Sequence, residues 1–180
     1  AAGLFCAGVA AQRGLKVILI DHSEKVAEKI RISGGGRCNF TNTGTTPANY
    51  LSNNPHFCKS ALARYTPQHF IEMVERHGIV YHEKELGQLF CDDSSKQIVK
   101  MLLDECEWAG VRINTSCSVS SIEKKPDLFV IKTSQGNIET HKCVIASGGL
   151  SIPSMGASGF GYEIAKQFGH KVLPTRAGLV

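Results

Sequence analysis

The stretch "GLFCAGVAAQRGLKVILID", residues 3–21, sets the fold class. Small residues fill its first part, which predicts a helix from about Gly3 to Arg13 that ends at Gly14. The run "LKVILID" that follows is continuously apolar and ends in an acid, as in a strand buried on both faces of a parallel sheet. A small-residue helix, a glycine turn and then a strand form the second half of a βαβ dinucleotide-binding unit. We therefore expect an α/β fold.

Gly3 and Asp21 take the places of two fingerprint residues in such a unit. The last glycine of G-x-G-x-x-G lies at the start of the helix, and an acid about 20 residues later binds the ribose hydroxyls. Gly3 and Asp21 are 18 positions apart, which fits this pattern. The first strand and the first two glycines are then expected upstream of residue 1. Taken alone the half-motif is a weak signal, because a helix precedes a buried strand in every α/β fold.

The composition is that of an ordinary globular protein, with 180 residues, 42% hydrophobic and 20% charged. The 20 Lys and Arg residues against 16 Asp and Glu give a formal charge of +4, which we interpret as too weak for nucleic-acid or membrane binding. The sequence has neither an apolar run long enough to span a membrane nor a signal-peptide pattern. We expect a cytoplasmic protein with no nucleic-acid partner and no membrane partner.

The seven cysteines are scattered and form no C-x-x-C pair, which is typical of reduced thiols rather than of a disulfide framework or a zinc site. The seven histidines are equally dispersed, so no metal site is predicted. Cys38 invites a redox role, but Cys58, the nearest cysteine in sequence, is 20 positions away. A packed thiol is the favoured interpretation of Cys38.

The rest of the chain alternates between helical and strand-like patterns. Thr66 and Pro67 predict the start of a helix, and "SQGN" at 134–137 predicts a hairpin turn. The last three strand runs indicate a meander inserted into the α/β order, and residues 43–60 form a connecting segment. We expect helices over 66–78, 94–110 and 159–168, and strands within 79–83, 87–91, 111–124, 128–133 and 138–147.

Two glycine-rich stretches, "RISGGGRCNFTN" (31–42) and "GGLSIPSMGASGFG" (148–161), are the remaining motifs. A chain without Cβ atoms can bring its amides against a pyrophosphate, and a helix N-terminus adds partial positive charge there. Arg37 is a fixed cation suited to a phosphate group. Taken alone, the glycine triplet is better interpreted as a plain solvent-exposed turn, and the second stretch is equally compatible with a flexible loop.

Together these motifs resemble those of a known family. "ISGGGRCNFTN" (32–42), "VIASGGLSIPSMGASGFGYEIAKQFGH" (144–170) and the terminal "AGLV" (177–180) have the order and spacing seen in the BaiN-like, or aminoacetone-oxidase-like, bacterial FAD-dependent flavoproteins. The resemblance covers essentially the whole chain and corresponds to the amino-terminal part of that family. It implies a glutathione-reductase-type, Rossmann-like FAD-binding domain with an inserted β-meander, over residues 1–180. A substrate-side domain and a carboxy-terminal flavin-fold segment are expected downstream.

The resemblance also implies roles for individual residues. Gly3 would lie under the FAD pyrophosphate, Asp21 would bind the adenosine ribose, and Val119 would offer its backbone to the adenine. The remaining implied FAD contacts are the flavin-side loop Ser33, Gly34, Gly35, Gly36, Arg37, Cys38 and Asn39, and the turn Ser147, Gly148 and Gly149. Three positions depart from the family pattern: Ser147 replaces Thr, Phe160 replaces Asp and Cys91 replaces Pro.

We expect an FAD-dependent oxidoreductase that transfers two electrons between flavin and a small organic or steroid-like substrate, with NAD(P)H as the candidate electron donor. The catalytic residues are not readable, because the sequence has no Ser-His-Asp set and no informative carboxylate pair. Two alternatives stay open. One is a flavin-dependent RNA-modifying relative, and the other is a Rossmann-like nucleotide-binding module without catalysis.

Overall fold

The computed structural model describes residues 1–176, and the terminal "AGLV" motif at 177–180 lies outside them. The described chain divides into two compact units. The first comprises residues 27–109 together with Ala1, and the second comprises residues 2–26 and those from Gly110 onward. Among the described residues, no helix is long and apolar enough to cross a lipid bilayer.

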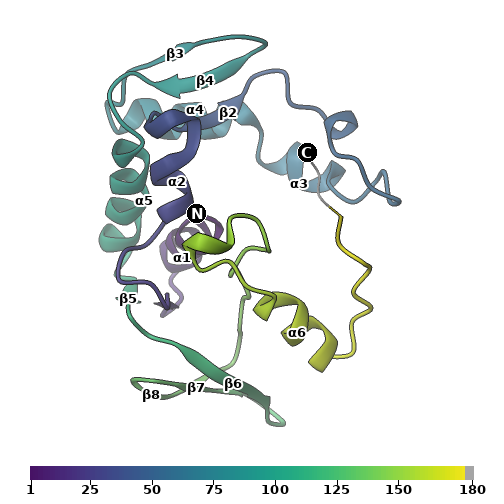
Figure 1. The fold of residues 1–180 in the computed structure, drawn as a ribbon. Coiled ribbons are helices and arrows are strands. Elements are labelled where there is room, and N and C mark those ends of the chain that lie inside the picture. The colour runs from purple at the N-terminus through teal and green to yellow at the C-terminus, as the bar shows by residue number, and fades with distance from the viewer. Residues whose placement is uncertain (177–180) are drawn as a thin grey trace. The chain divides into compact units, whose positions relative to one another are not determined.

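The first unit contains a three-stranded antiparallel sheet in the order β2-β4-β3 (Figure 1). Helix α4 contacts β2, and helix α2 contacts α5. Its strands are β2 (Asn39–Asn42), β3 (Tyr81–Glu83) and β4 (Gln88–Cys91), and its helices are α2 (Glu28–Ile32), α3 (Lys59–Arg64), α4 (Pro67–Arg76) and α5 (Lys96–Trp108). Short 3₁₀ helices span Ser33–Gly36 and Pro47–Asn49.

The core of the first unit is made by one face of each long helix. Ile71 and Val74 of α4 are buried, because their spacing places them on the same side of that helix. Ile98 and Leu102 do the same in α5. The Thr66 cap and Pro67 at the first helical position match the predicted start of α4.

A polar cluster also joins α4 to α5. His77 lies 2.8 Å from a buried carboxylate oxygen of Glu105, and Arg76 lies 3.3 Å from the same oxygen. The His77 ring stacks on Trp108 with its centroid 5.0 Å away. A buried carboxylate with such partners avoids the cost of an unpaired charge.

The second unit contains a parallel pair of strands, β1 and β5. It also contains a separate antiparallel meander in the order β6-β7-β8, which Figure 1 shows. Its strands are β1 (Ile18–Ile20), β5 (Arg112–Asn114), β6 (Val119–Lys124), β7 (Phe129–Thr133) and β8 (Gly136–Thr140). Its helices are α1 (Ala2–Gln12) and α6 (Phe160–Gln167), with a 3₁₀ helix at Pro153–Met155. Thr133 pairs with Gly136, so the predicted hairpin turn is present.

Two of the strand predictions need correction. We predicted that the strand in "LKVILID" (15–21) is buried on both faces, but Ile18 of β1 is exposed, and β5 is the one partner strand of β1 among the described residues. We also predicted a strand over 138–147, but β8 ends at Thr140 and Val144 is 67% exposed. Within residues 1–176 no strand pairs with 142–147, and an unpaired segment does not form a ladder.

Candidate functional site

The predicted site residues are distributed over both compact units, and each group has its own local geometry. Gly3, Asp21, Val119 and the turn at 147–149 belong to the second unit, and the loop from Ser33 to Asn39 belongs to the first. In the described chain, no three His, Cys, Asp or Glu side chains gather as metal ligands would.

The loop from Ser33 to Cys38 is tightly wound. Gly34, Gly35 and Gly36 all have positive φ, at 58°, 66° and 88°, which glycine adopts without steric cost. Cys38 is also left-handed, at φ 57°, and its amide donates to the carbonyl of Ser33 at 3.0 Å. A non-glycine residue in this region is uncommon and indicates that the surrounding structure imposes the conformation.

Hydrogen bonds from β4 and α5 hold this loop in place. The amide of Cys91 donates to the carbonyl of Arg37 at 3.0 Å, and the amide of Ser95 donates to that of Gly36 at 2.7 Å. The Ser95 hydroxyl donates to the carbonyl of Arg31, also at 2.7 Å, and Ser95 is almost fully buried. Ser95 was not among the predicted site residues. Its hydroxyl bonds to α2 and its amide to the loop, two contacts with residues distant in sequence.

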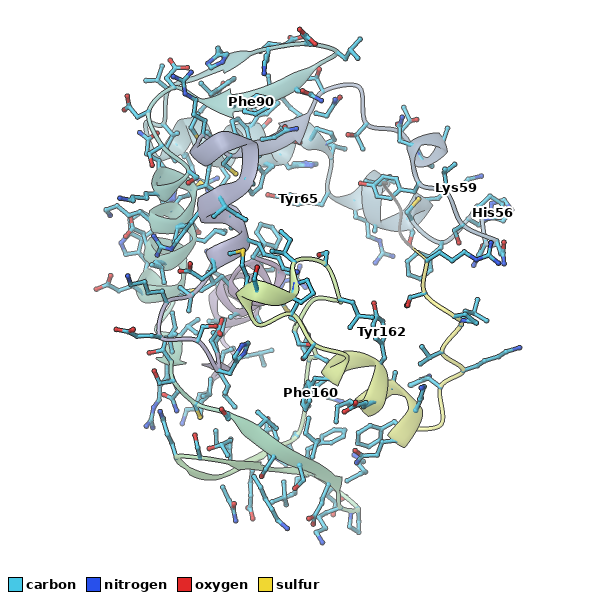
Figure 2. The ribbon with its side chains drawn as sticks, in the orientation of Figure 1. His56, Lys59, Tyr65, Phe90, Phe160 and Tyr162 are labelled. Carbon is cyan, nitrogen blue, oxygen red and sulfur yellow. The ribbon has the colours of Figure 1, made fainter. Side chains whose placement is uncertain are left out.

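The three glycines of the loop differ in their surroundings. A Cβ at Gly34 would lie 2.7 Å from a ring carbon of Phe90 and 2.8 Å from the Asn39 amide nitrogen, whereas a Cβ at Gly35 or Gly36 would meet no atom within 4 Å. Phe90 is labelled in Figure 2. Gly34 is therefore required by the packing of this unit. Gly35 and Gly36 leave open space beside an exposed Arg37 side chain.

Cys38 and Cys91 are both buried, which agrees with the prediction of packed thiols. Burial raises the pKa of the Cys38 thiol, and a hydrogen bond with Ser33 partly opposes this shift. Burial also raises the pKa of Cys91, to about 11, with a smaller contribution from Cys38. A thiolate is the reactive form of cysteine, so these shifts disfavour a nucleophilic role for either residue.

In the second unit, Asp21 directly follows β1 and is fixed by its backbone. Its amide donates to the carbonyl of Asn114 at 2.9 Å, and its carbonyl accepts from the Cys117 amide at 3.0 Å. Its side-chain Oδ1 accepts from the Ser23 amide at 2.9 Å. Among the described residues, Oδ2 has no hydrogen-bond partner, so one oxygen of a half-buried carboxylate remains for a ligand.

Gly3 and Val119 lie near the same strand as Asp21. A Cβ at Gly3, in the first turn of α1, would lie 3.5 Å from Ala146 Cβ and 3.7 Å from Leu19 of β1. Both distances are ordinary van der Waals contacts, so the turn packs beside β1 without requiring a glycine at this position. Val119 starts β6, two residues after Cys117, and it packs against the core cluster of Ile122, Ile131 and Ile164.

The turn at Ser147, Gly148 and Gly149 lies against the start of α6. A Cβ at Gly149 would come within 2.8 Å of the Tyr162 hydroxyl, and a Cβ at Gly161 would lie 3.1 Å from the Ser147 hydroxyl. Phe160, where the resembling family has Asp, packs against the core cluster of the meander. Tyr162 and Phe160 are labelled in Figure 2. The Phe160 side chain therefore has an apolar packing role in this chain.

The polar groups and the helix start of the second unit fit an FAD molecule. A ribose presents two hydroxyl donors, and Asp21 retains one carboxylate oxygen that accepts no other bond among the described residues. Gly3 brings the first turn of α1 close to β1, which is the arrangement that dinucleotide-binding folds use under a pyrophosphate. In the first unit, the space beside Gly35 and Gly36 also admits a ligand.

Comparisons with known proteins agree with this geometry. The chain matches the HI0933-like protein Rossmann domain over residues 1–180. It is 57% identical over 180 residues to a protein named ribosomal RNA dihydrouridine synthase from Escherichia coli (strain K12), a match that covers 100% of this chain and 45% of that protein. It is 26% identical over 178 residues to a 3-dehydro-bile acid delta(4,6)-reductase from Clostridium scindens, covering 97% of this chain and 43% of that protein. The chain thus spans less than half the length of these curated relatives.

Glycine oxidase from Bacillus cereus ATCC 14579 is similar in fold, with a TM-score of 0.53 at 18% identity, over 83% of this chain and 55% of that one. The expected fold class, an α/β Rossmann-like domain, is confirmed.

One expectation is wrong. We expected no nucleic-acid partner, but the 57% identical relative is named for its action on ribosomal RNA. The expectation failed because the net charge of a whole chain averages over its surface, whereas binding depends on local charge.

The confirmed resemblance is therefore broader than the BaiN-like group named from the motifs: the chain belongs to the HI0933-like protein Rossmann domain family.

Proposed function

We propose that the full-length protein is an FAD-dependent reductase that converts uridine to dihydrouridine in ribosomal RNA. The observation that carries this proposal is the 57% identity, over the whole of this chain, to a protein named ribosomal RNA dihydrouridine synthase. A second such protein, from Haemophilus influenzae, is 51% identical over 184 residues. The Rossmann-like fold and the donor set around Asp21 support FAD as the cofactor.

The proposed chemistry is the reduction of a carbon–carbon double bond conjugated to a carbonyl group. Reduced FAD, when bound, supplies a hydride, which together with a proton saturates the C5–C6 bond of uracil in a balanced two-electron step. The 26% identical relative is named as a reductase of the 4,6 double bonds of a 3-oxo steroid acid, and this substrate has the same conjugated arrangement. The two names thus favour the reductive direction over an oxidase reaction.

The residues of this chain contribute binding and orientation to that reaction. In the second unit, we assign Asp21 to the adenosine ribose, Gly3 to the pyrophosphate, the Val119 backbone to the adenine, and the turn Ser147 to Gly149 to a close approach to the cofactor. In the first unit, the loop from Ser33 to Asn39 stays a proposed contact of the flavin side, with Arg37 as a fixed positive charge. NAD(P)H as the electron donor and a cytoplasmic location are also proposals.

A small steroid-like or other enone substrate is the second candidate, and the bile-acid reductase relative favours it. Its identity of 26% is less than half of the 57% shared with the RNA-named relative. We therefore rank the narrower resemblance to BaiN-like flavoproteins below the RNA-modifying assignment. A nucleotide-binding module without catalysis is a third reading, which the same experiment tests.

The experiment uses purified full-length protein, ribosomal RNA from cells that lack its gene, and NADH or NADPH. After incubation, the RNA is digested to nucleosides and dihydrouridine is quantified by mass spectrometry. We expect flavin to be released on denaturation and dihydrouridine to form only with a reduced cofactor present. Reduction of a conjugated steroid without any dihydrouridine would move the assignment to the second candidate. Absence of both activities in a flavin-free protein would favour the binding module.

A further inference from the structure

The net positive charge of the chain comes from one segment that lacks acidic residues. Residues 29–71 contain five Lys and Arg residues and no Asp or Glu. The other 137 residues carry 15 Lys and Arg against all 16 Asp and Glu. The run therefore has a local positive charge that the +4 total does not reveal, and Arg31 at its start is paired with Glu28 at 3.3 Å.

The central part of this run, residues 43–65, is also the most exposed part of the first unit. None of its residues is buried. Three of its apolar side chains project into solvent, with Leu51 at 96%, Phe57 at 80% and Tyr50 at 51% exposure. Lys59 and Arg64 on α3 are exposed as well, and Figure 2 labels His56 and Lys59 on this segment.

The 43–65 segment is anchored at its two ends and makes its own contacts between them. The amide of Thr43 donates to the carbonyl of Gly87, and Thr66 begins α4 with its capping box. Between these points the hydrogen bonds include the short-range pairs Asn49 to Thr46 and Tyr65 to Ala61, and the Cys58 thiol contacts the carbonyl of Pro47 within the segment. The segment therefore offers its side chains without burying them under described residues of its own unit.

Exposed aromatic rings interleaved with Lys and Arg are the features that single-stranded nucleic acid recognises. Bases stack on the aromatic faces while the cations follow the phosphates. A purely apolar protein partner fits less well, because Phe57 stands between His56 and Lys59 rather than in a continuous apolar patch. The acid-free composition removes the like-charge repulsion that a phosphate backbone would otherwise meet.

We propose that the 43–65 segment binds an unpaired stretch of RNA, with Lys59 and Arg64 contacting phosphates and Tyr50 and Phe57 stacking on bases. This inference rests on the proposed RNA substrate and names the surface of this chain that recognises it.

The test measures binding of a fluorescein-labelled single-stranded RNA oligonucleotide to full-length protein by anisotropy at several salt concentrations. The double variant Lys59→Glu/Arg64→Glu should raise Kd by about 10-fold or more and lower the slope of log K against log salt by about 1 to 2. Phe57→Ala should raise Kd on the order of 5- to 100-fold and leave the slope unchanged. The matched control is Lys166→Glu/Lys171→Glu, which makes the same charge change in the second unit and should leave Kd near that of the parent.

Melting temperature and flavin content are recorded for every variant. If the Glu pair fails to fold, Lys59→Gln/Arg64→Gln removes the same charges without adding acids. Binding of the oligonucleotide by the charge variant as tightly as by the control pair overturns the proposal. A large fall in melting temperature for Phe57→Ala with RNA binding intact also overturns it, since the segment then packs against protein.

The dihydrouridine assay separates the two proposals. If the parent forms dihydrouridine and the charge variant binds RNA normally, the reductase assignment stands and the proposed RNA-binding surface is wrong. A parent that binds RNA through the segment and forms no dihydrouridine removes the reductase assignment alone. A parent that neither binds the oligonucleotide nor forms dihydrouridine removes both.

Discussion

The two glycine-rich turns of the molecule look alike in sequence and differ in what their glycines do. In the loop at 33–38, a Cβ at Gly34 would meet both a ring carbon of Phe90 and the backbone nitrogen of Asn39 below 3.0 Å. In the turn at 147–149, a Cβ at Gly149 would meet the Tyr162 hydroxyl at 2.8 Å, which is the far end of a side chain that can move. Gly34 in the first turn is thus restricted by backbone as well as by a side chain, whereas Gly149 in the second turn is restricted only by a side-chain end that can move.

Gly34→Ala should have the largest effect of the changes that probe this comparison. A left-handed alanine costs about 1–2 kcal/mol, and overpacking adds about 1–3 kcal/mol, so the free energy of unfolding should fall by about 2–5 kcal/mol. Thermal or urea unfolding of the full-length protein measures it. Gly78→Ala is the matched control, because Gly78 has a similar φ of 65° and no atom within 4 Å of its Cβ position. Equal losses in the two variants would mean that the contact with Phe90 and Asn39 contributes nothing.

Cys91 predicts a pH dependence for the region that holds the first turn. Its pKa rises from 9.0 to about 11 on folding, because burial disfavours the thiolate. The folded state therefore binds the thiol proton more tightly than the unfolded state. The resulting contribution of Cys91 to the free energy of unfolding is complete below pH 9 and is lost as the pH rises toward 11. The loss approaches about 3 kcal/mol as an upper value. Urea unfolding between pH 8 and pH 11 should show a smaller decline in the free energy of unfolding for Cys91→Ala than for the parent. The tyrosines and lysines titrate in both proteins, so their contribution cancels in this comparison. Parallel declines would contradict the assignment.

Asp21→Asn tests the second unit, where the proposed ligand contact is a side chain rather than a turn. Asparagine retains the size and can still accept from the Ser23 amide, but it lacks the charge. Hydrogen bonds to a charged group contribute about 1.5–3 kcal/mol, so FAD affinity should fall roughly 10- to 100-fold. Fluorescence titration of the flavin-depleted full-length protein measures this change. The melting temperature without FAD should barely move, and an unchanged FAD affinity would assign Asp21 to the Ser23 turn alone.

Gly35→Ala sharpens the comparison within the first turn. Gly35 has the same left-handed backbone as Gly34 and open space around it, so the substitution should cost about 1–2 kcal/mol of backbone strain without a clash. The folded protein should persist but retain less FAD if the cofactor approaches this backbone. Bound flavin after purification, compared with that of Gly78→Ala, provides the measurement. Equal flavin content in the two variants would make the loop a structural turn.

Much of this architecture follows from local sequence signals, and the failures come from non-local contacts. The start of α4 follows from Thr66 and Pro67, and α5 follows from the spacing of apolar residues in 96–108. Both signals are local, because caps and periodicity act within a few residues. The strand expected to reach residue 147 ends at Thr140, since a ladder depends on a partner distant in sequence.

The same division applies to the candidate site. The glycine triplet marks the loop, but its sequence does not distinguish Gly34, which packs on Phe90, from Gly35, which does not. The left-handed Cys38 and the clamp by Ser95 likewise depend on a neighbouring strand and helix. By contrast, the absence of acids from 29 to 71 was readable in the sequence, and the whole-chain charge concealed it.

Gly149→Ala should have the smallest effect, because no backbone strain is involved and only the Tyr162 hydroxyl must move. We expect a loss of less than about 1 kcal/mol in the free energy of unfolding. Tyr162→Phe removes the atom that the new methyl would meet, so Gly149→Ala should be nearly silent in the Tyr162→Phe background. A double-mutant cycle on the full-length protein should therefore give a coupling of about 0.5 kcal/mol or more. Absence of coupling would show that Tyr162 does not restrict this turn. A loss as large as that of Gly34→Ala, unrelieved by Tyr162→Phe, would erase the difference between the two turns, because the second would then be as rigid as the first.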